Sequence, residues 1–332
     1  MASNVSDRIA GSVVGAIVAE AAGAPIHWVY DPATLEKILS KYPQPEFIPD
    51  GHCPFYRLPT GRNGCVGEQA LVLLESLVQC KGFDSKHLRS RMYAAFGPDS
   101  DYEVEGTVTK DQLPISGPWR PGHLKAFVAN FEENEEITGS KDGPNGDAYA
   151  KLVPLVALYA GKPELEKYVI EATRMTHNND LSVDCAIAAA KVLERLMLDG
   201  WTSKETPEQI VADVACLSPA GMKIALGAAI DAKAQPHKDA VQKFQSNCGL
   251  PQSLQTSLHA FLSAGFDTDF PSAIRPTLTA CGDNLPRLMF AGACVGSRVG
   301  VDGIPKDWLD KTLKRDWIIQ QAKELVSLRE KK

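Results

Sequence analysis

The stretch that decides the fold of this chain is Cys281-Gly282-Asp283-Asn284-Leu285-Pro286, which opens an apolar helix expected to end at Gly300. Mg²⁺ and Ca²⁺ take oxygen ligands, so a turn that holds such an ion presents closely spaced carboxylates and hydroxyls. Here Asp283 is the single carboxylate, and a leucine and a proline follow where further oxygens are expected. The stretch therefore has the form of a metal-binding turn that has lost most of its ligands.

Helical spacing of apolar residues extends outward from this turn over almost the whole chain. The first predicted helix begins at Ser6 or Asp7 and continues to about Ala22, with Gly11 and Gly15 on one face. Each glycine weakens a helix by about 1 kcal/mol relative to alanine, which indicates close packing against another helix or a ligand. The other predicted helices cover residues 34–39, 68–80, 85–96, 122–131, 148–160, 163–176, 181–198, 206–215, 219–232, 239–246, 252–264, 269–280, 285–299 and 314–329.

Alternating strand patterns are scarce, and residues 47–49 and 102–108 are the two short candidates. No linker rich in Gly, Ser or Pro divides the chain, so we predict an all-α, compact single domain over residues 1–332. Residues 43–67 and 97–121 are long predicted loops. Loops of that length in a compact domain are usually functional or mobile.

Composition excludes several classes of protein. Hydrophobic residues make up 44% of the chain and charged residues 23%, as in ordinary globular domains. The net charge of −6 argues against nucleic acid as a partner. The N-terminus lacks the pattern of a secretory signal, and no run of 18 or more apolar residues exists, so we expect no transmembrane span. We therefore expect a cytoplasmic monomer that does not associate with membranes.

The eight cysteines are scattered, with no C-x-x-C pair, so we expect free thiols and neither a disulfide framework nor a zinc site. Cys65 stands in front of a predicted helix. A thiol at a helix N-terminus can have a lowered pKa and act as a nucleophile or redox centre. The nearby acid Glu68 should raise that pKa, so the preferred prediction is an unreactive Cys65.

The chain resembles the ADP-ribosylglycohydrolase family over nearly its whole length. Four motifs of the family have a counterpart in this chain. They are the opening G-x-x-x-G-D-x-x-G-x-P helix, the N-G-x-x-x-R-x-x-P-L segment, the T-H turn, and the G-D-x-D-T helix with an I-P-x-x-W tail. These counterparts are Gly15 to Pro25, Asn145 to Leu155 (one residue longer and without the arginine), Thr176-His177, Gly282-Asp283 and Ile304-Pro305 with Trp308. The resemblance implies a multi-helical orthogonal bundle. In family enzymes, oxygens hold Mg²⁺ against ribose hydroxyls while an acidic residue activates water.

The departures from the family pattern decide the functional prediction. Enzymes of the family carry T-D-D-T-Q before an early helix, whereas residues 64–68 here read Gly-Cys-Val-Gly-Glu, and shifting the alignment by one residue does not restore the aspartate pair. Leu285 and Pro286 replace the second aspartate and the threonine of the C-terminal motif. Asp283 remains, with Asn284 as a weak substitute ligand. This pattern resembles the branch that contains the jellyfish lens J-type crystallins and a related fish selenoprotein.

Each candidate site residue has two interpretations. Glu20 could line a cleft, or it could be a buried acid bonded to a glycine-bearing loop. His27 could act as a general base near neutral pH, or it could be the polar edge of an aromatic cluster. Asp283 could bind a cation, or it could cap a helix. His177 is expected mainly to shape a turn between two helices.

Ligand contacts are predicted from the same resemblance. Trp119 and Tyr102, on the long loops, could stack on an adenine ring, or they could simply cover the core. Asn145 and Gly146 are further candidates for ligand binding, because they belong to the family-like central segment.

The sequence thus favours a structural lens crystallin that requires no cofactor and no partner. The alternative is an active or ADP-ribose-binding glycohydrolase that uses Mg²⁺ with Glu20, His27 and Asp283. A thiol-based redox protein centred on Cys65 is the third hypothesis.

Overall fold

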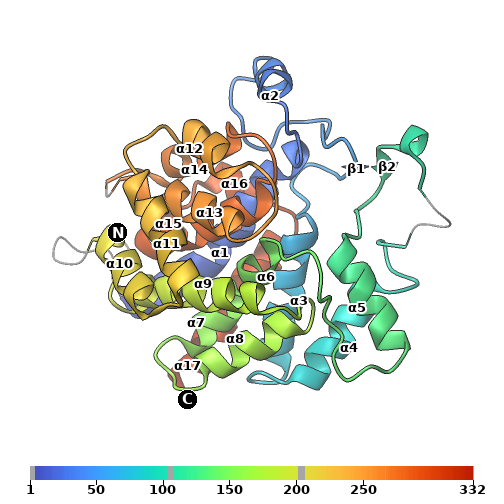
Figure 1. Cartoon of the computed structure of the whole chain (residues 1–332), viewed down its shortest axis with the longest axis vertical. Helices are drawn as coiled ribbons and strands as arrows, with labels where there is room; N and C mark the ends of the chain where they lie inside the picture. The colour runs from blue at the N-terminus through green and yellow to red at the C-terminus, as the bar shows by residue number, and fades with distance from the viewer. Residues whose placement is uncertain (1–3, 104–107, 201–205, 266, 332) are drawn as a thin grey trace.

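Two glycine-bearing helices cross in contact at the centre of the fold (Figure 1): α1 (Val5–Gly23) and α15 (Leu285–Val299). A Cβ atom on Gly11 would lie 2.2 Å from the carbonyl oxygen of Gly296, and one on Gly15 would lie 2.5 Å from that of Gly292. Only glycine allows the two backbones to approach this closely. The predicted close helix packing at Gly11 and Gly15 is therefore confirmed.

The structure is a computed structural model that describes residues 4–103, 108–200, 206–265 and 267–331. The remaining helices surround the central pair, with α4 and α5 on one side and α10, α11, α12 and α14 on the other (Figure 1). Their bounds are α2 Pro32–Leu39, α3 Cys65–Gln79, α4 Ser85–Phe96, α5 Gly122–Glu132, α6 Asp147–Ala150, α7 Val153–Tyr159, α8 Leu165–Arg174, α9 Asp180–Leu198, α10 Pro207–Leu217, α11 Ala220–Asp231, α12 His237–Phe244, α13 Gln252–Leu262, α14 Phe270–Leu278, α16 Lys306–Lys311 and α17 Arg315–Glu330, with short 3-10 turns η1 Ala24–Ile26, η2 Lys110–Gln112 and η3 Val301–Gly303.

Most predicted helices are confirmed to within a few residues, and the bounds predicted for α4 and α15 are those observed. The first helix begins earlier than expected, because the side chain of Asn4 accepts a hydrogen bond from the backbone of Asp7. The predicted helix over 148–160 is wrong, since it is divided into α6 and α7. Pro154 lacks a backbone N–H and its ring clashes with the carbonyl four residues earlier, which belongs to Ala150 at the end of α6.

The strand predictions need correction. Residues 47–49 form no strand: Phe47 has a φ of 50°, and its amide donates to the carbonyl of Ala22. The second candidate, 102–108, lies partly outside the described residues. The observed strands are β1 (Tyr56–Arg57) and β2 (Ile115–Ser116), a parallel pair that joins the two long loops at one edge of the molecule (Figure 1).

One hydrophobic core runs through the described residues from α1 to α17, and a small satellite cluster lies beside it at Ala232, Ala240 and Phe244. The chain is therefore a mostly helical single domain. Val5–Ile26 is long and apolar enough to cross a membrane by length and composition alone, which the sequence analysis did not anticipate. However, 94% of its most apolar window is buried inside the protein, as expected of a central core helix.

Candidate functional site

A cavity of about 480 Å³ opens where α3, α5, α6 and α15 begin. We call it the cleft. The beginnings of α3 and α15, which are far apart in the sequence, both contribute to its wall. The long loops complete it, so their predicted functional position is supported by the geometry. Residues used below that line the cleft are His27, Trp28, Cys65, Val66, Trp119, His123, Asp142, Asn145, Asp147, Cys248, Asp283 and Leu285.

Hydrocarbon fills the part of the cleft where the family motif places metal-binding oxygens. Leu285 is fully buried, and its Cδ1 lies 2.4 Å from the position that a Cβ on Gly64 would take. Val66 is 1% exposed. Within the described ranges, no three His, Cys, Asp or Glu side chains are placed to share a metal ion. The residues present therefore do not fit a magnesium centre of the enzyme type.

His27 and Asp283 meet across 256 residues of sequence. The His27 Nε2–H donates to Asp283 Oδ1 at 2.8 Å, and the Tyr56 hydroxyl donates to His27 Nδ1 at 2.6 Å. Burial lowers the pKa of His27, against the opposing effect of Asp283, while burial raises the pKa of Tyr56. His27 is thus a neutral imidazole with both nitrogens occupied, which leaves neither free to take a proton from water.

His27 also belongs to an aromatic cluster, as one interpretation of the sequence proposed. Its ring stacks on Trp28 with centroids 4.1 Å apart, and Trp28 meets Phe55 edge to face at 5.3 Å. The aromatic-cluster interpretation of His27 therefore matches the structure, whereas the general-base interpretation does not, because both ring nitrogens are occupied. The same side chain closes the aromatic cluster and fixes the orientation of Asp283.

Neither Asp283 nor Asn284 caps α15 with its side chain. The carboxylate of Asp283 turns to His27, and the Asn284 amide donates to the carbonyl of Gly23 at 3.2 Å. Asn284 does not line the cleft. Only Asp283 of this pair is placed to contact a ligand.

Glu20 fastens the turn before α3 and does not line the cleft. Its carboxylate accepts hydrogen bonds from Asn63 Nδ2 at 2.7 Å and from the backbone amides of Gly64 and Gly67 at 3.0 and 3.2 Å. Burial raises its pKa to about 8, although these donors oppose the shift. This is the arrangement of the second interpretation, an acid bonded to a glycine-bearing loop.

Sequence reasoning missed Asp147, a buried carboxylate on the cleft wall. Its Oδ2 accepts hydrogen bonds from Gln69 Nε2 at 3.0 Å and from the Cys65 thiol at 3.4 Å, and His123 Nε2 lies 3.3 Å from the same oxygen. Burial raises the pKa of Asp147 to about 6, and the nearby charge of Asp283 adds to the shift. Two donors on one oxygen, with the imidazole of His123 beside it, hold this carboxylate in a fixed orientation.

A series of hydrogen bonds runs from the buried side chain of Lys151 to His123, which lies beside Asp147. Lys151 Nζ donates to Thr176 Oγ1, and that hydroxyl donates to His177 Nδ1 at 2.9 Å. With the tautomers that satisfy every group, His177 Nε2 donates to Asn145 Oδ1 at 3.2 Å. The Asn145 amide donates to His123 Nδ1 at 3.3 Å, and His123 Nε2 lies 3.3 Å from Asp147 Oδ2. The buried side chains of Lys151 and Asp147 are thus connected through Thr176, His177, Asn145 and His123.

Lys151 was also missed, although the sequence held a signal for it. The family's arginine precedes its P-L pair by three residues, and Lys151 precedes Pro154 by the same interval. Burial lowers the pKa of Lys151 to about 7, against the attraction of Asp147. His177, predicted to shape a turn, has that role and also links Lys151 to Asn145.

The other predicted ligand residues differ in placement. Trp119 lines the cleft and packs on Phe55, with Lys125 Nζ 5.3 Å from its ring centroid. Tyr102 is 2% exposed and lies outside the cleft. Asn145 lines the cleft. Gly146 does not, and a Cβ on it would lie 2.3 Å from Ser253 Oγ.

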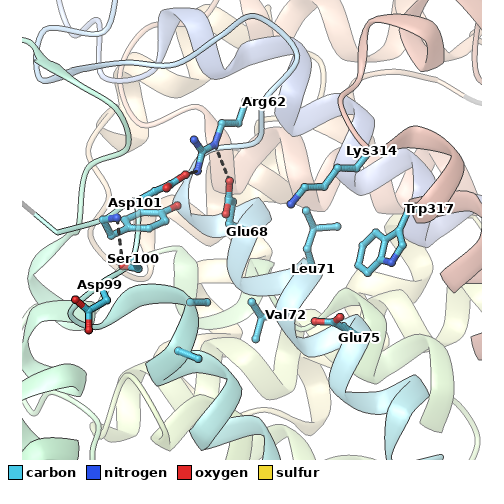
Figure 2. Close-up of a pocket in the computed structure, with 13 residues that line it drawn as sticks. Arg62, Glu68, Leu71, Val72, Glu75, Asp99, Ser100, Asp101, Lys314 and Trp317 are labelled. Atoms are coloured by element: carbon cyan, nitrogen blue, oxygen red, sulfur yellow. Dashed lines mark hydrogen bonds and ion pairs between the residues drawn. The ribbon is translucent and has the colours of Figure 1, made fainter.

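Helix α3 also borders a second cavity, of about 660 Å³, which Figure 2 shows. Arg62 bridges Glu68 at 2.9 Å and Asp101 at 3.0 Å there, while Lys314 and Trp317 face the helix. Except for Tyr102, no predicted site residue lines this cavity. Its main ion pairs are satisfied internally, so the cleft is the better candidate site.

Cys65 is expected to be unreactive because its thiol is buried beside Asp147, and not because of Glu68, as the sequence suggested. Burial raises the pKa of the Cys65 thiol well above its usual range, and the charge of Asp147 raises it further. Glu68, the acid named in the prediction, pairs with Arg62 instead. In timed labelling at about pH 6, Cys65 should react no faster than the exposed Cys216, which serves as an internal reference. Rapid selective labelling of Cys65 would restore the redox hypothesis.

The fold and the cleft define a helical protein of the ADP-ribosylglycohydrolase type. A solved structure described as an ADP-ribosylglycohydrolase-related protein complex matches with a TM-score of 0.70 and 21% identity, covering 98% of this chain and 99% of that chain. Residues 1–332 match the ADP-ribosylglycohydrolase family, and the chain belongs to it. The predicted family and all-α fold class are confirmed.

Individual relatives point to the branch predicted from the sequence. The chain is 34% identical to Crystallin J1A and 33% identical to Crystallin J1B of Tripedalia cystophora, over 98% of this chain and of each relative. It is 26% identical to the ADP-ribosyl-[dinitrogen reductase] glycohydrolase of Rhodospirillum rubrum, over 93% of this chain and 91% of that protein. The resemblance to J-type crystallins is therefore confirmed at the level of sequence.

Proposed function

We propose that this protein is a structural, non-hydrolytic member of its family with the role of a soluble lens crystallin. The observation that carries the proposal is the packing of Leu285 over Gly64, beside the buried Val66, in the place of metal-binding carboxylates. A metal-dependent mechanism needs an ion to position substrate and to stabilise charge. Hydrocarbon at these positions supplies neither function.

The similarity to Crystallin J1A and Crystallin J1B supports the structural part of the proposal. A net charge of −6 favours solubility at high concentration. Four of the eight cysteines are buried and two more are partly buried, which also limits oxidative cross-linking of a concentrated protein. We further propose that the protein works in the cytoplasm as a monomer, without cofactor, nucleic acid or membrane.

The test is hydrolysis. The purified protein should release no ADP-ribose from serine-, arginine- or O-acetyl-linked substrates at physiological Mg²⁺ concentration, because the remaining acids do not form a metal centre. Product release is measured by chromatography, with an active family enzyme as the positive control. Metal-stimulated turnover that disappears in Asp283→Asn would contradict the proposal.

A glycohydrolase, or an ADP-ribose-binding protein with a rearranged site, is the second candidate. The observation in its favour is the cleft itself, whose volume lies within the usual range for ligand sites and whose wall includes Trp119. Against it, the residues that line the cleft within the described ranges include three aspartates and no lysine or arginine to meet a diphosphate. Calorimetry with ADP-ribose and Mg²⁺ together distinguishes the two candidates.

A further inference from the structure

We propose that the cleft binds a small organic ammonium ion, held between its aspartates and its tryptophans. The inference concerns binding and does not depend on whether the protein hydrolyses any bond. It follows from four features of the described residues: the charges on the wall, the unused carboxylate oxygens, the aromatic surface and the field inside the cavity.

The charged side chains on the cleft wall are all acidic. Asp142, Asp147 and Asp283 line it, and the described lining includes neither lysine nor arginine. The two imidazoles on the wall, His27 and His123, have pKa values lowered by burial and are therefore neutral at neutral pH. A cation entering the cleft meets carboxylates on the lining, while the ammonium of Lys125, which is not a lining residue, lies 5.3 Å from the ring centroid of Trp119.

Two of these carboxylates each keep one oxygen without a protein donor. Both hydrogen bonds to the Asp147 carboxylate and its 3.3 Å contact with His123 reach Oδ2, and the bond from His27 to Asp283 reaches Oδ1. No described residue donates to Asp147 Oδ1 or Asp283 Oδ2, and neither atom is enclosed by protein. Asp147 is 8% exposed and Asp283 is 4% exposed. A buried anion with an unused oxygen facing a cavity favours a positively charged partner.

Aromatic surface stands beside the acids. Trp28 has a φ of 58°, which is strained for a bulky residue. A two-bond bridge holds it there: the Trp28 amide donates to the carbonyl of Gly282 at 3.1 Å, and the Gly282 amide donates to that of Val29 at 2.7 Å. This bridge places the Trp28 indole on the cleft wall beside Gly282, the residue that directly precedes Asp283. Organic ammonium ions bind to the faces of such rings.

Buried cations behind the wall do not cancel the negative field. Lys151 is bonded to Thr176, and Arg287 donates to the carbonyls of Ala280 and Cys281. At Cys248, on the wall, Asp283 and then Asp147 raise the thiol pKa after burial. The acids therefore dominate at the surface that a ligand would touch.

The experiment compares choline with 3,3-dimethyl-1-butanol, which has the same shape but no charge. Binding is followed by tryptophan fluorescence and calorimetry at constant ionic strength. Choline should bind saturably and about tenfold or more tightly than the uncharged alcohol, as expected for a desolvated cation–aromatic contact beside a carboxylate. Equal affinity for the two molecules, or no saturable change with choline, would overturn the proposal.

Variants locate the site. Asp283→Asn keeps the acceptor for His27 and should weaken choline binding about tenfold, and Trp119→Leu should weaken it as well. Asp316→Asn removes the same charge from an exposed position on α17, and should leave choline binding unchanged. Circular dichroism and melting curves verify that each variant is folded. An equal loss in Asp283→Asn and Asp316→Asn would show that binding is non-specific and would refute the assignment.

Discussion

Gly296→Val is expected to prevent stable folding. A Cβ on Gly296 would lie 2.1 Å from the carbonyl oxygen of Gly11 and 2.8 Å from its carbonyl carbon. These are backbone atoms of α1, so no side-chain rotation can relieve the clash, and α1 and α15 must separate. A separation of the two central helices opens voids on both sides of the contact. We expect a loss of at least about 4 kcal/mol, a large fraction of the stability of a typical domain.

The measurement is chemical denaturation, with soluble yield as a second readout if the variant does not fold. Gly296→Ala gives a graded version of the same change and should also destabilise strongly. The matched control is Gly227→Ala in α11, where no atom lies within 4 Å of the added Cβ. Because alanine is the better helix former, Gly227→Ala should stabilise by about 0.5–1 kcal/mol. Similar effects at Gly296 and Gly227 would show that the glycine contact does not determine the helix crossing.

This contact illustrates how far the sequence could predict the fold. Two glycines spaced by four residues in α1 are unfavourable locally, so their presence indicated a close neighbour. The identity of that neighbour, Gly292 and Gly296 in α15, requires the tertiary structure. The same limit applies to α6 and α7. The chemistry of Pro154 explains why the helix is interrupted, but the apolar periodicity continues across the interruption and predicted one helix.

The parts of the candidate site that belong to short sequence motifs were predictable. The contacts between residues far apart in the sequence were not. The family resemblance identifies both the segment around Cys65 and the turn at Asp283 as counterparts of metal-binding motifs, and both line the cleft. The pairing of His27 with Asp283 spans 256 residues, and no local pattern specifies it. Asp147 and Lys151 were overlooked because one resembles an ordinary helix-start acid and the other a surface lysine. Their roles depend on Thr176 and His177, which come from a different part of the chain.

Rebuilding the lost ligand set should create a cation site at a cost in stability. The triple variant Cys65→Asp, Val66→Asp and Leu285→Asp adds three carboxylates to a cavity that already holds Asp283. Val66 and Leu285 are almost fully buried, so two of the new charges lose hydration and all repel one another. In the presence of a chelator the variant should therefore be less stable than the parent by several kcal/mol, on the order of 3 or more.

Mg²⁺ or Ca²⁺ should then restore much of that loss. A ligand that binds only the folded state stabilises it by about 2.7 kcal/mol at a concentration one hundred times its dissociation constant. The parent protein, in which no three described His, Cys, Asp or Glu side chains are placed to share a metal ion, should show little shift under the same conditions. Thermal unfolding with and without the cation, at fixed ionic strength, measures both effects.

Two controls separate metal binding from a general charge effect. The triple variant Cys65→Asn, Val66→Asn and Leu285→Asn has similar shape without the charges, and it should not respond to the cation. Adding Asp283→Asn to the aspartate variant should greatly reduce the response, because Asp283 is the carboxylate that the family motif retains. Leu285 and Val66 would then account for the missing metal centre, since replacing hydrocarbon by oxygen at these positions restores it. If the parent and the aspartate variant instead respond equally to Mg²⁺, the correspondence of residues 64–68 and 285 with the family's ligand positions is wrong, although both segments line one cavity.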